Sequence, residues 1–346
     1  MSDEAIDQAS LEDWFAREVD GAQPPLEFER ISGGRSNLTY SISDDGHEWV
    51  LRRPPLGHVL PTAHDMAREY KVLDGLAATS VPVPRPLAFC ADIDVNDAPF
   101  YVMEKVDGQI LRTPQEMAQL TTDDARRCSE ALIDVLVQIH AVDYDAVGLG
   151  DFGHPDGYLE RQVRRWGEQW ERSKTRELPA VDELARRLRA GLPESPPPTI
   201  VHGDYRLDNT MLSAKDPGEI VAVLDWEMAT LGDPLSDVGL FLLYWKRDEN
   251  AAVGVSATID SRKGFLTRDE IVARYADASG RDVSQLDFYE ILASYKLAII
   301  VEGIHARFLM GKTVGDGFEG IGTMVESMIM GALDQASKSS IPGLRG

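Results

Sequence analysis

The chain contains 346 residues, of which 43% are hydrophobic and 27% are charged, and its formal net charge is −23. This composition predicts a soluble globular protein with a sizeable core, and the excess of negative charge argues against nucleic acid or an anionic membrane as a partner. The two cysteines have no metal-like spacing, and the acidic N-terminus and short apolar runs predict neither a secretory signal nor a membrane span. We therefore expect a cytoplasmic protein.

The first part of the chain predicts one helix followed by a sheet of short strands. Apolar residues at helical spacing precede the pair Pro24-Pro25, and strand-like runs extend from Phe28 to Leu51 with turns between them. The first turn consists of Gly33, Gly34, Arg35, Ser36 and Asn37. Glycine lets backbone amides approach a phosphate group closely, because no side chain intervenes. A plain hairpin is the alternative, and the cationic strand end that follows favours a phosphate cradle.

Two adjacent arginines, Arg52 and Arg53, end the strand that follows. By themselves the two residues could be surface charges that flank a strand end, which Pro54 and Pro55 terminate. A helix is predicted from about Ala63 to Ala78, and Glu69 lies on its apolar face. A carboxylate that points toward a core requires a cation, so we expect an ion pair between Glu69 and Arg52. The alternative is an exposed carboxylate beside its helix neighbours.

Farther along, residues 114–142 have the apolar spacing of one long helix, which ends near His140. We interpret His140 as a structural residue. The following segment GYLERQVRRWGEQW places Arg161 and Arg165 on one helix face, together with Trp166. This group is either a basic patch for an anionic part of a substrate or a solvated helix with aromatic packing, and the sequence leaves both interpretations open.

The stretch from Thr199 to Asp237 contains two short apolar runs, and each run ends in a cluster of Asp, Asn or His. Asp204 follows the first run, Asn209 comes five residues later, and Asp225 follows the second run. Phosphoryl transfer requires a carboxylate that orients or deprotonates the attacking hydroxyl, and amide and carboxylate oxygens that hold Mg²⁺ against the phosphates. Asp and Asn are also common turn residues, but this combination and spacing match those three roles.

The strings HGDYRLDN and VLDWEMATLGDP resemble the aminoglycoside phosphotransferase and choline kinase-like family of small-molecule kinases. With GGRSNLTY, WVLRRPP, FYVMEKVDG and GYLERQVRRW, the chain resembles most closely the kinase-like domains associated with acyl-CoA dehydrogenases. The resemblance implies an α+β, two-lobed protein-kinase-like fold. Residues 1–107 would form a small N-lobe with an N-terminal helix, a five-stranded antiparallel sheet and one helix. Residues 108–346 would form a larger, mainly helical C-lobe.

The resemblance also implies roles for the site residues. ATP and Mg²⁺ would be the cofactors, with Asp204 as the catalytic carboxylate and Asn209 and Asp225 as metal ligands. Family members normally carry a lysine at the position of Arg52, where it contacts the nucleotide phosphates and pairs with a helix glutamate. The resemblance therefore favours Arg52 as the phosphate contact, and the alternative is Arg53 or neither residue. Family members also bind adenine along the linker between the lobes. The linker residues here are Met103, Glu104, Lys105 and Val106.

We therefore expect an ATP- and Mg²⁺-dependent kinase that phosphorylates a hydroxyl group, with a nucleotide and a small-molecule acceptor as its partners. A hydroxyacyl thioester or another small anionic metabolite ranks above an aminoglycoside as acceptor, because the C-terminal carboxylates are interspersed with cations. His202 is expected to brace the loop, and Arg206 either neutralises developing charge or lies at the surface. The alternative from another class is a nucleotide-binding module with little transfer activity, suggested by arginine at the lysine position. The sequence predicts no particular oligomeric state.

Overall fold

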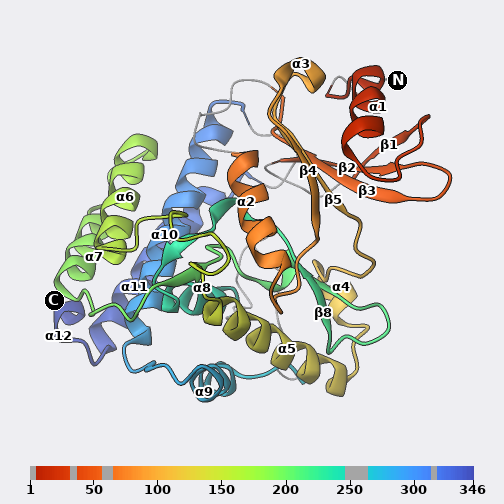
Figure 1. Ribbon diagram of the computed structural model, residues 1–346. Helices are drawn as coiled ribbons and strands as arrows, with labels where there is room; N and C mark the ends of the chain where they lie inside the picture. Colours follow the sequence, from red (N-terminus) through yellow and green to blue (C-terminus); the bar gives the residue numbers. More distant parts are fainter. Residues whose placement is uncertain (1–4, 32–36, 57–64, 246–263, 313–317) are drawn as a thin grey trace.

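The computed structural model describes residues 5–31, 37–56, 65–245, 264–312 and 318–346, and it shows a lobe built on a sheet and a second, mainly helical lobe (Figure 1). The first lobe holds a five-stranded antiparallel sheet with the strand order β1-β2-β3-β5-β4. Its strands are β1 (Glu27–Arg30), β2 (Leu38–Ser43), β3 (Glu48–Arg53), β4 (Pro86–Cys90) and β5 (Phe100–Glu104). The predicted two-lobed α+β fold is confirmed, whereas the lobe boundary at residue 107 stays a prediction.

Two helices cover opposite faces of this sheet, α1 (Gln8–Glu18) on the outer face and α2 (Met66–Ala77) on the face toward the second lobe. Because side chains alternate along a strand, Phe100 packs in the cluster of α1 whereas Tyr101 packs in that of α2. The ring of Trp14 meets that of Phe100 edge to face, with centroids 4.7 Å apart. The sheet is therefore buried on both faces, and α2 connects it to the second lobe.

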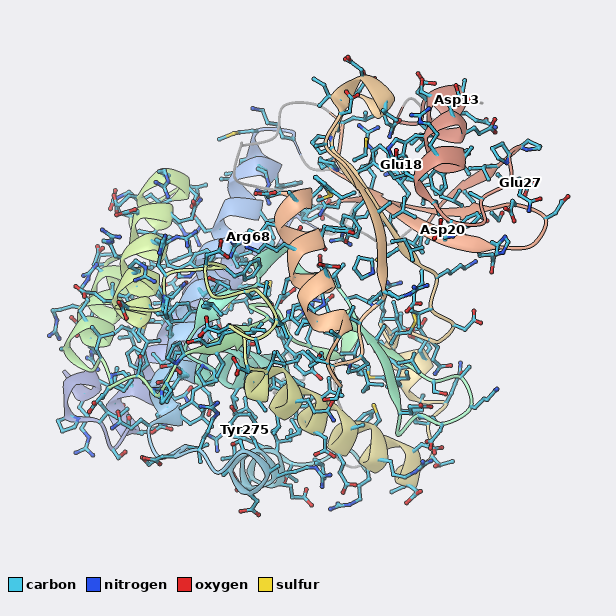
Figure 2. The ribbon with its side chains drawn as sticks, viewed as in Figure 1. Asp13, Glu18, Asp20, Glu27, Arg68 and Tyr275 are labelled. Carbon is cyan, nitrogen blue, oxygen red and sulfur yellow. The ribbon has the colours of Figure 1, made fainter. Side chains whose placement is uncertain are left out.

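Acidic side chains gather around the outer end of the first lobe (Figure 2). Asp13, Glu18 and Asp20 on and after α1, and Glu27 on β1, are all exposed. They contribute to the net charge of the chain but lie away from the second lobe. The net charge therefore does not indicate the local charge between the lobes.

The second lobe is packed around the long helix α10 (Leu286–Leu309), which contacts α6, α7, α8 and α11. Helix α10 is apolar on nearly every side, as expected for a helix in a protein interior. The other helices of the described residues are α3 (Ile93–Asn96), α4 (Pro114–Met117), α5 (Thr122–Ala141), α6 (Tyr158–Ser173), α7 (Pro179–Ala190), α8 (Leu235–Trp245), α9 (Arg268–Ser279), α11 (Ile321–Lys338) and α12 (Pro342–Arg345). None of the helices that the structure describes combines the length and apolar character needed to cross a membrane.

The segment 114–142 forms the two helices α4 and α5, and the prediction of one long helix was wrong. A capping box at Thr121 is the cause of the break. Its hydroxyl oxygen accepts a hydrogen bond from the amide of Asp124 at 3.1 Å, while the Asp124 carboxylate accepts one from the amide of Thr121. This arrangement starts a new helix even though the apolar spacing continues across the break.

Two short ladders carry the two polar clusters. Strand β6 (Thr199–Val201) pairs with β9 (Thr230–Gly232), and β7 (Thr210–Leu212) pairs with β8 (Ile220–Val223). Single turns of 3₁₀-helix, at residues 207–209 and 226–228, follow β6 and β8. Both apolar runs predicted as strands are therefore strands, and each delivers its polar residues at its end.

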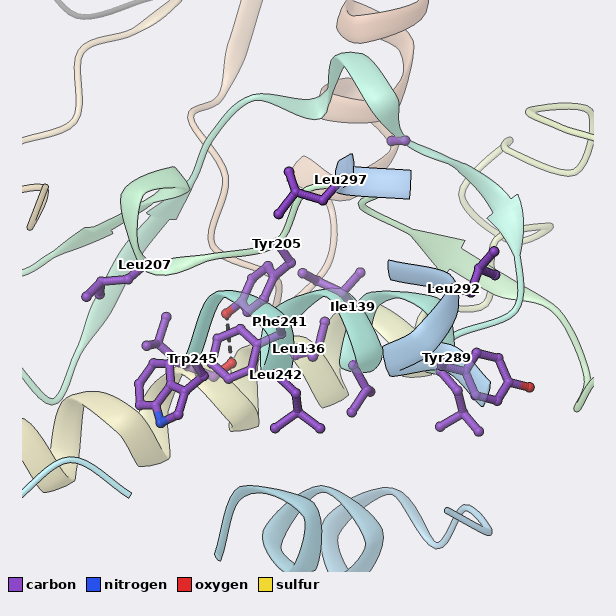
Figure 3. Close-up of a cluster of buried hydrophobic side chains, with 14 of the residues drawn as sticks. Leu136, Ile139, Tyr205, Leu207, Phe241, Leu242, Trp245, Tyr289, Leu292 and Leu297 are labelled. Carbon is purple, nitrogen blue, oxygen red and sulfur yellow. Dashed lines mark hydrogen bonds between the residues drawn. The ribbon is translucent and has the colours of Figure 1, made fainter. Parts of the chain in front are cut away.

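Buried aromatic residues support the loop that follows β6 (Figure 3). Tyr205 is fully buried, and its hydroxyl donates a hydrogen bond to the carbonyl oxygen of Leu132 at 2.7 Å. Its ring lies against Phe241 of α8, which stacks on Trp245. A buried tyrosine with a satisfied hydroxyl fixes the loop at this point. Asp204, its neighbour in the chain, is thereby held in place relative to the second lobe.

Candidate active site

One buried carboxylate, that of Asp237 on α8, holds the loop after β6. It accepts hydrogen bonds from the backbone amides of His202 at 2.7 Å and Gly203 at 2.8 Å, and its Oδ2 lies 3.3 Å from His140 Nε2. Burial opposes the ionisation of Asp237, but the hydrogen bonds to His140 and to the loop outweigh it and lower its pKa. His140, which also bonds the hydroxyl of Tyr275 at 2.8 Å, is structural, as predicted.

His202 braces the same loop, as predicted. Its Nδ1 accepts a hydrogen bond from the amide of Asp204 at 3.2 Å, and its Nε2 lies 2.9 Å from the carbonyl oxygen of Leu224. Because the carbonyl can only accept, the ring carries its proton on Nε2. His202 thus connects the two chain segments that end in Asp204 and Asp225.

The Asp204 carboxylate is held by two direct hydrogen bonds. Asn209 Nδ2 donates to its Oδ2 at 3.0 Å, and the hydroxyl of Tyr244 donates to its Oδ1 at 3.2 Å. Arg206 Nε lies 3.6 Å from the same Oδ2, and its guanidinium lies 5.1 Å from the ring centroid of Tyr244. Burial raises the pKa of Tyr244, and the Asp204 charge raises it further, so the phenol stays a hydrogen-bond donor. Arg206 is therefore beside the carboxylate and not a surface residue.

A backbone hydrogen bond brings the segments of Asn209 and Asp225 side by side. The amide of Leu224, the residue before Asp225, donates to the carbonyl oxygen of Asn209 at 2.8 Å. The Nδ2 group of Asn209 is directed to the carbonyl and the carboxylate of Asp204, so the amide oxygen is the atom left to face a cation. Asp225 has a φ of 67°, a left-handed conformation that is strained for a residue other than glycine. Such strain is common at functional sites.

These oxygen donors fit Mg²⁺, which takes one or two carboxylates and completes its octahedron with phosphate oxygens and water. Among the residues that the structure describes, no group of three His, Cys, Asp or Glu side chains could hold a metal ion by itself. Glu227 is a further carboxylate two residues beyond Asp225, and it accepts a hydrogen bond from Asn37 Nδ2 at 3.2 Å. The donor set therefore suits a cation that arrives with a phosphorylated ligand.

The predicted ion pair between Arg52 and Glu69 is present, with Arg52 Nε 3.1 Å from Glu69 Oε2. The same guanidinium also reaches Asp225, with its Nη2 2.5 Å from Oδ1. Burial opposes the charge of Arg52, but Glu69, Tyr101 and Asp225 outweigh it and raise its pKa. Burial raises the pKa of Glu69 and Arg52 counteracts this effect. Arg52 therefore bridges the helix carboxylate and the predicted metal ligand.

Arg53 points to the opposite side of the sheet from Arg52. Its side chain is 3% exposed and donates to the carbonyl oxygens of Pro54 and Ala5. It therefore belongs to the interior of the first lobe, and of the two arginines only Arg52 reaches the site. Of the predicted glycine turn, Gly33, Gly34, Arg35 and Ser36 lie outside the described residues. Asn37 is buried and contacts Glu227 through the hydrogen bond given above.

The linker residues lie at the end of β5. Met103 is buried on the face toward α2, and Val106 is half-buried. The amide of Glu104 donates to the carbonyl oxygen of Arg85 at 2.9 Å and so is not directed at a ligand. The exposed Lys105 pairs with Glu48 at 2.7 Å. The role of this linker in binding adenine stays a prediction.

The three predicted acceptor residues of α6 occupy different positions. The guanidinium of Arg161 donates to the carbonyl oxygens of His154 and Asp156 and so holds the turn before the helix. Arg165 is exposed, and Trp166 is half-buried with its ring centroid 5.7 Å from Lys296 Nζ. Trp166 therefore lies near Lys296, and Arg161 has a structural contact.

Four residues of the site escaped the sequence analysis: Glu227, Asp237, Tyr244 and Lys296. Lys296 carried one signal, since it is a cation inside the apolar run of α10, where a charge needs a partner. Its Nζ donates to the carbonyl oxygen of Gly203 at 2.8 Å. Asp237 and Tyr244 carried no local signal, because their partners are more than thirty residues away in the chain.

Comparisons with known proteins show the family to which the chain belongs. A family model described as the phosphotransferase enzyme family matches residues 27–289. Acyl-CoA dehydrogenase family member 11 from Gallus gallus is 31% identical over 98% of this chain, which corresponds to 45% of the length of that protein. The chain thus spans less than half the length of the curated relatives that it matches.

Solved structures show the same fold. A protein from Ralstonia eutropha JMP134, provisionally described as an aminoglycoside phosphotransferase, is 32% identical, with a TM-score of 0.83 over 96% of this chain and 99% of that one. Choline kinase from Cryptosporidium parvum Iowa II has a TM-score of 0.67 at 13% identity, over 98% of this chain and 99% of that one, and this likeness is one of fold alone.

The family match includes the sheet, α2 and both polar clusters, and it ends within α10 before Lys296. It confirms the resemblance seen in the motifs, and the relatives include acyl-CoA dehydrogenase family members, as predicted. The chain belongs to the phosphotransferase enzyme family.

Proposed function

We propose that this chain is an ATP- and Mg²⁺-dependent kinase that transfers the γ-phosphoryl group to a hydroxyl of a small molecule. The observation that carries the proposal is the Asp204 carboxylate, fixed by Asn209 and Tyr244 next to the oxygen donors of Asn209 and Asp225. A carboxylate held in this way can orient a hydroxyl and accept its proton.

In the proposed reaction, the acceptor oxygen forms a bond to the γ-phosphorus, and the bond from that phosphorus to the bridging oxygen breaks. ADP leaves with the electron pair of the broken bond, and the hydroxyl proton passes to a carboxylate oxygen of Asp204. Asn209 and Asp225 would hold Mg²⁺, which neutralises charge on the phosphate oxygens when bound. Arg206, beside Asp204, would supply positive charge near the reacting oxygen. Arg52, held by Glu69, would supply positive charge to the phosphates.

The test compares ADP formation by the wild type and Asp204→Asn over a panel of hydroxylated metabolites. Asparagine keeps the size of the side chain but cannot accept the proton, so we expect turnover to fall by about 10²- to 10⁴-fold. Asp151→Asn, which alters an exposed carboxylate paired with Lys71, is the matched control and should retain wild-type turnover. Equal rates for Asp204→Asn and the wild type would contradict the assignment.

The acceptor is proposed to be a hydroxyacyl thioester or another small anionic molecule. An aminoglycoside would require carboxylates that converge on its ammonium groups. Glu302 of α10 is fully buried and pairs with Arg176 at 3.2 Å, so its charge is already neutralised within the protein. Lys296 instead places a positive charge at the loop of Asp204, through its bond to the carbonyl oxygen of Gly203.

A second candidate function is a nucleotide-binding module with little transfer activity. The contact between Arg52 and Asp225 favours it. The guanidinium is paired with a carboxylate that would have to bind Mg²⁺ for phosphoryl transfer. Tight binding of Mg-ATP without ADP formation over the whole acceptor panel is the outcome expected from such a module. Transfer to any of the acceptors would exclude it.

A further inference from the structure

Arg68 on α2 joins the first lobe to the backbone of the second lobe. It is half-buried on the side of α2 that faces the second lobe (Figure 2). Its Nη2 group donates to the carbonyl oxygens of Phe152 at 2.6 Å and Ala229 at 2.9 Å, and its guanidinium carbon lies 3.9 Å from the ring centroid of Phe152. The contact therefore combines two hydrogen bonds from a charged donor with a cation–π interaction.

Both acceptor carbonyls belong to a well-packed part of the second lobe. Phe152 and Ala229 are each 2% exposed. At Gly153, the residue after Phe152, a Cβ atom would lie 2.8 Å from the amide nitrogen of Leu231, so the two backbone segments are in close contact. Arg68 is therefore attached to two segments that are packed against each other.

One of these segments carries the predicted metal ligand. Ala229 follows the turn of 3₁₀-helix at residues 226–228, which begins directly after Asp225. The next strand, β9, starts at Thr230 and pairs with β6, and the loop of Asp204 follows β6. Arg68 therefore holds α2 at a point between Asp225 and the strand pair that supports Asp204.

The neighbouring residue Glu69 provides a second link between α2 and the same segment, because it holds Arg52, which pairs with Asp225. Two consecutive residues of α2 thus reach the segment 225–229, one at each end. The two links respond differently to a bound metal ion. A cation at Asp225 would neutralise the carboxylate and repel Arg52, whereas Arg68 is bonded to backbone carbonyls that the cation does not neutralise.

We propose that Arg68 is a positioning residue that keeps α2 and Glu69 in place against the segment 225–229 when Mg²⁺ displaces Arg52 from Asp225. The inference rests on the proposed kinase function, since it concerns Mg²⁺ and nucleotide at the same site. Glu69 then stays in position and holds Arg52 for the phosphates. The contact between Arg52 and Asp225 is accordingly a feature of the metal-free protein and is compatible with phosphoryl transfer.

The test measures the affinity for a non-hydrolysable ATP analogue by calorimetry, with Mg²⁺ and with EDTA, in the wild type and in Arg68→Met. With EDTA the variant keeps the link through Arg52, so it should bind the analogue within about 2-fold of the wild type. With Mg²⁺ that link is lost, and the variant should bind about 5-fold or more weakly, a factor that corresponds to the loss of one partly exposed ion pair. The amide hydrogens of α2 should also exchange faster than in the wild type when Mg²⁺ and the analogue are bound.

Lys71→Met is the matched control. Lys71 lies on the same helix, and its Nζ is 2.5 Å from a carboxylate oxygen of Asp151, the residue before Phe152. Both side chains of this pair are exposed, so its loss should leave the affinities at their wild-type values with and without Mg²⁺. Arg68→Gln, which is shorter and uncharged, should show the same Mg²⁺-dependent loss and replaces Arg68→Met if that variant does not fold. Arg68→Lys keeps a cationic donor and should recover part of the affinity.

The comparison of the two conditions separates positioning from general support of the fold. If Arg68 only stabilised the structure, its loss would weaken binding by the same factor with Mg²⁺ and with EDTA. Equal factors, wild-type affinity in Arg68→Met, or an equally large loss in Lys71→Met would overturn the inference and leave the proposed kinase function intact. Failure of the wild type to bind the analogue with Mg²⁺ would contradict the proposed kinase function, and the inference with it.

Discussion

Arg52 connects two carboxylates from distant parts of the chain, and its removal is the most informative perturbation of the site. The Glu69 side chain is 2% exposed and that of Arg52 is 13% exposed, so Arg52→Met leaves a buried carboxylate without its cation. Breaking a buried pair in this way costs about 3–5 kcal/mol. The contact with Asp225, whose side chain is 31% exposed, is screened by solvent and contributes about 1 kcal/mol or less. We therefore expect the free energy of unfolding to fall by about 3–5 kcal/mol, out of a total of about 5–15 kcal/mol.

Urea unfolding followed by tryptophan fluorescence measures this loss at neutral pH. The double variant Arg52→Met/Glu69→Met replaces the pair by apolar side chains and should recover stability to within about 1 kcal/mol of the wild type. This recovery is the decisive comparison. If the double variant is as unstable as Arg52→Met, the cost does not come from an unpaired buried charge, and the reasoning is wrong.

The pH dependence of stability gives an independent test of the same ion pair. Burial already raises the pKa of Glu69 above its ordinary value, and the loss of Arg52 removes the main opposing charge and raises it further. A carboxyl group whose pKa is raised in the folded state binds a proton more tightly in the folded than in the unfolded protein. Its protonation therefore stabilises the fold at low pH. This stabilisation is lost as the pH rises through the folded-state pKa. The difference in free energy of unfolding between Arg52→Met and the wild type should therefore decrease as the pH falls toward about 4.3, the ordinary pKa of glutamate. A gap that widens on acidification would contradict this account.

Three further perturbations test other parts of the site. Tyr244→Phe removes a hydrogen bond to a charged carboxylate and should lower kcat about 10-fold with little change in Tm, whereas an unchanged kcat would mean that the bond does not position Asp204. Gly203→Ala should lower stability by about 1–3 kcal/mol in thermal unfolding, because φ is +83° and a Cβ would lie 2.7 Å from the carbonyl oxygen of Met228. Its control Gly331→Ala, in open space on α11, should not lose stability. Burial raises the pKa of Cys128 to about 12, so a thiol reagent at neutral pH should modify it only after unfolding, and rapid modification of the folded protein would refute its burial.

Local patterns predicted the N-terminal helix, the strands between Phe28 and Leu51 and the two apolar runs that carry the polar clusters, and they are the basis of the chemistry proposed for the site. Alternation along the strands, the spacing of Asp204 and Asn209, and the apolar run before Asp225 each involve residues within a few positions of one another. The pair of Glu69 and Arg52 could also be predicted, since a carboxylate on the apolar face of a helix must find a cation. The helix break at Thr121 was missed because the apolar spacing continues across it, although its capping box is a local signal.

The sequence by itself indicated the two-lobed fold class, through its resemblance to a family, and it predicts Asp204, Asn209 and Asp225 as the polar residues of a phosphoryl-transfer centre. Only the tertiary structure decided that Arg52 also meets Asp225, 173 residues away, that Arg161 serves its own turn, and that Tyr244 and Lys296 reach the loop of Asp204. The physical reason is that a side chain's partner depends on how helices such as α8 and α10 pack, and packing is set by contacts between distant segments. The spacing of residues along the chain indicates the chemistry that a segment can perform. The packing of the helices determines which charged group each side chain contacts.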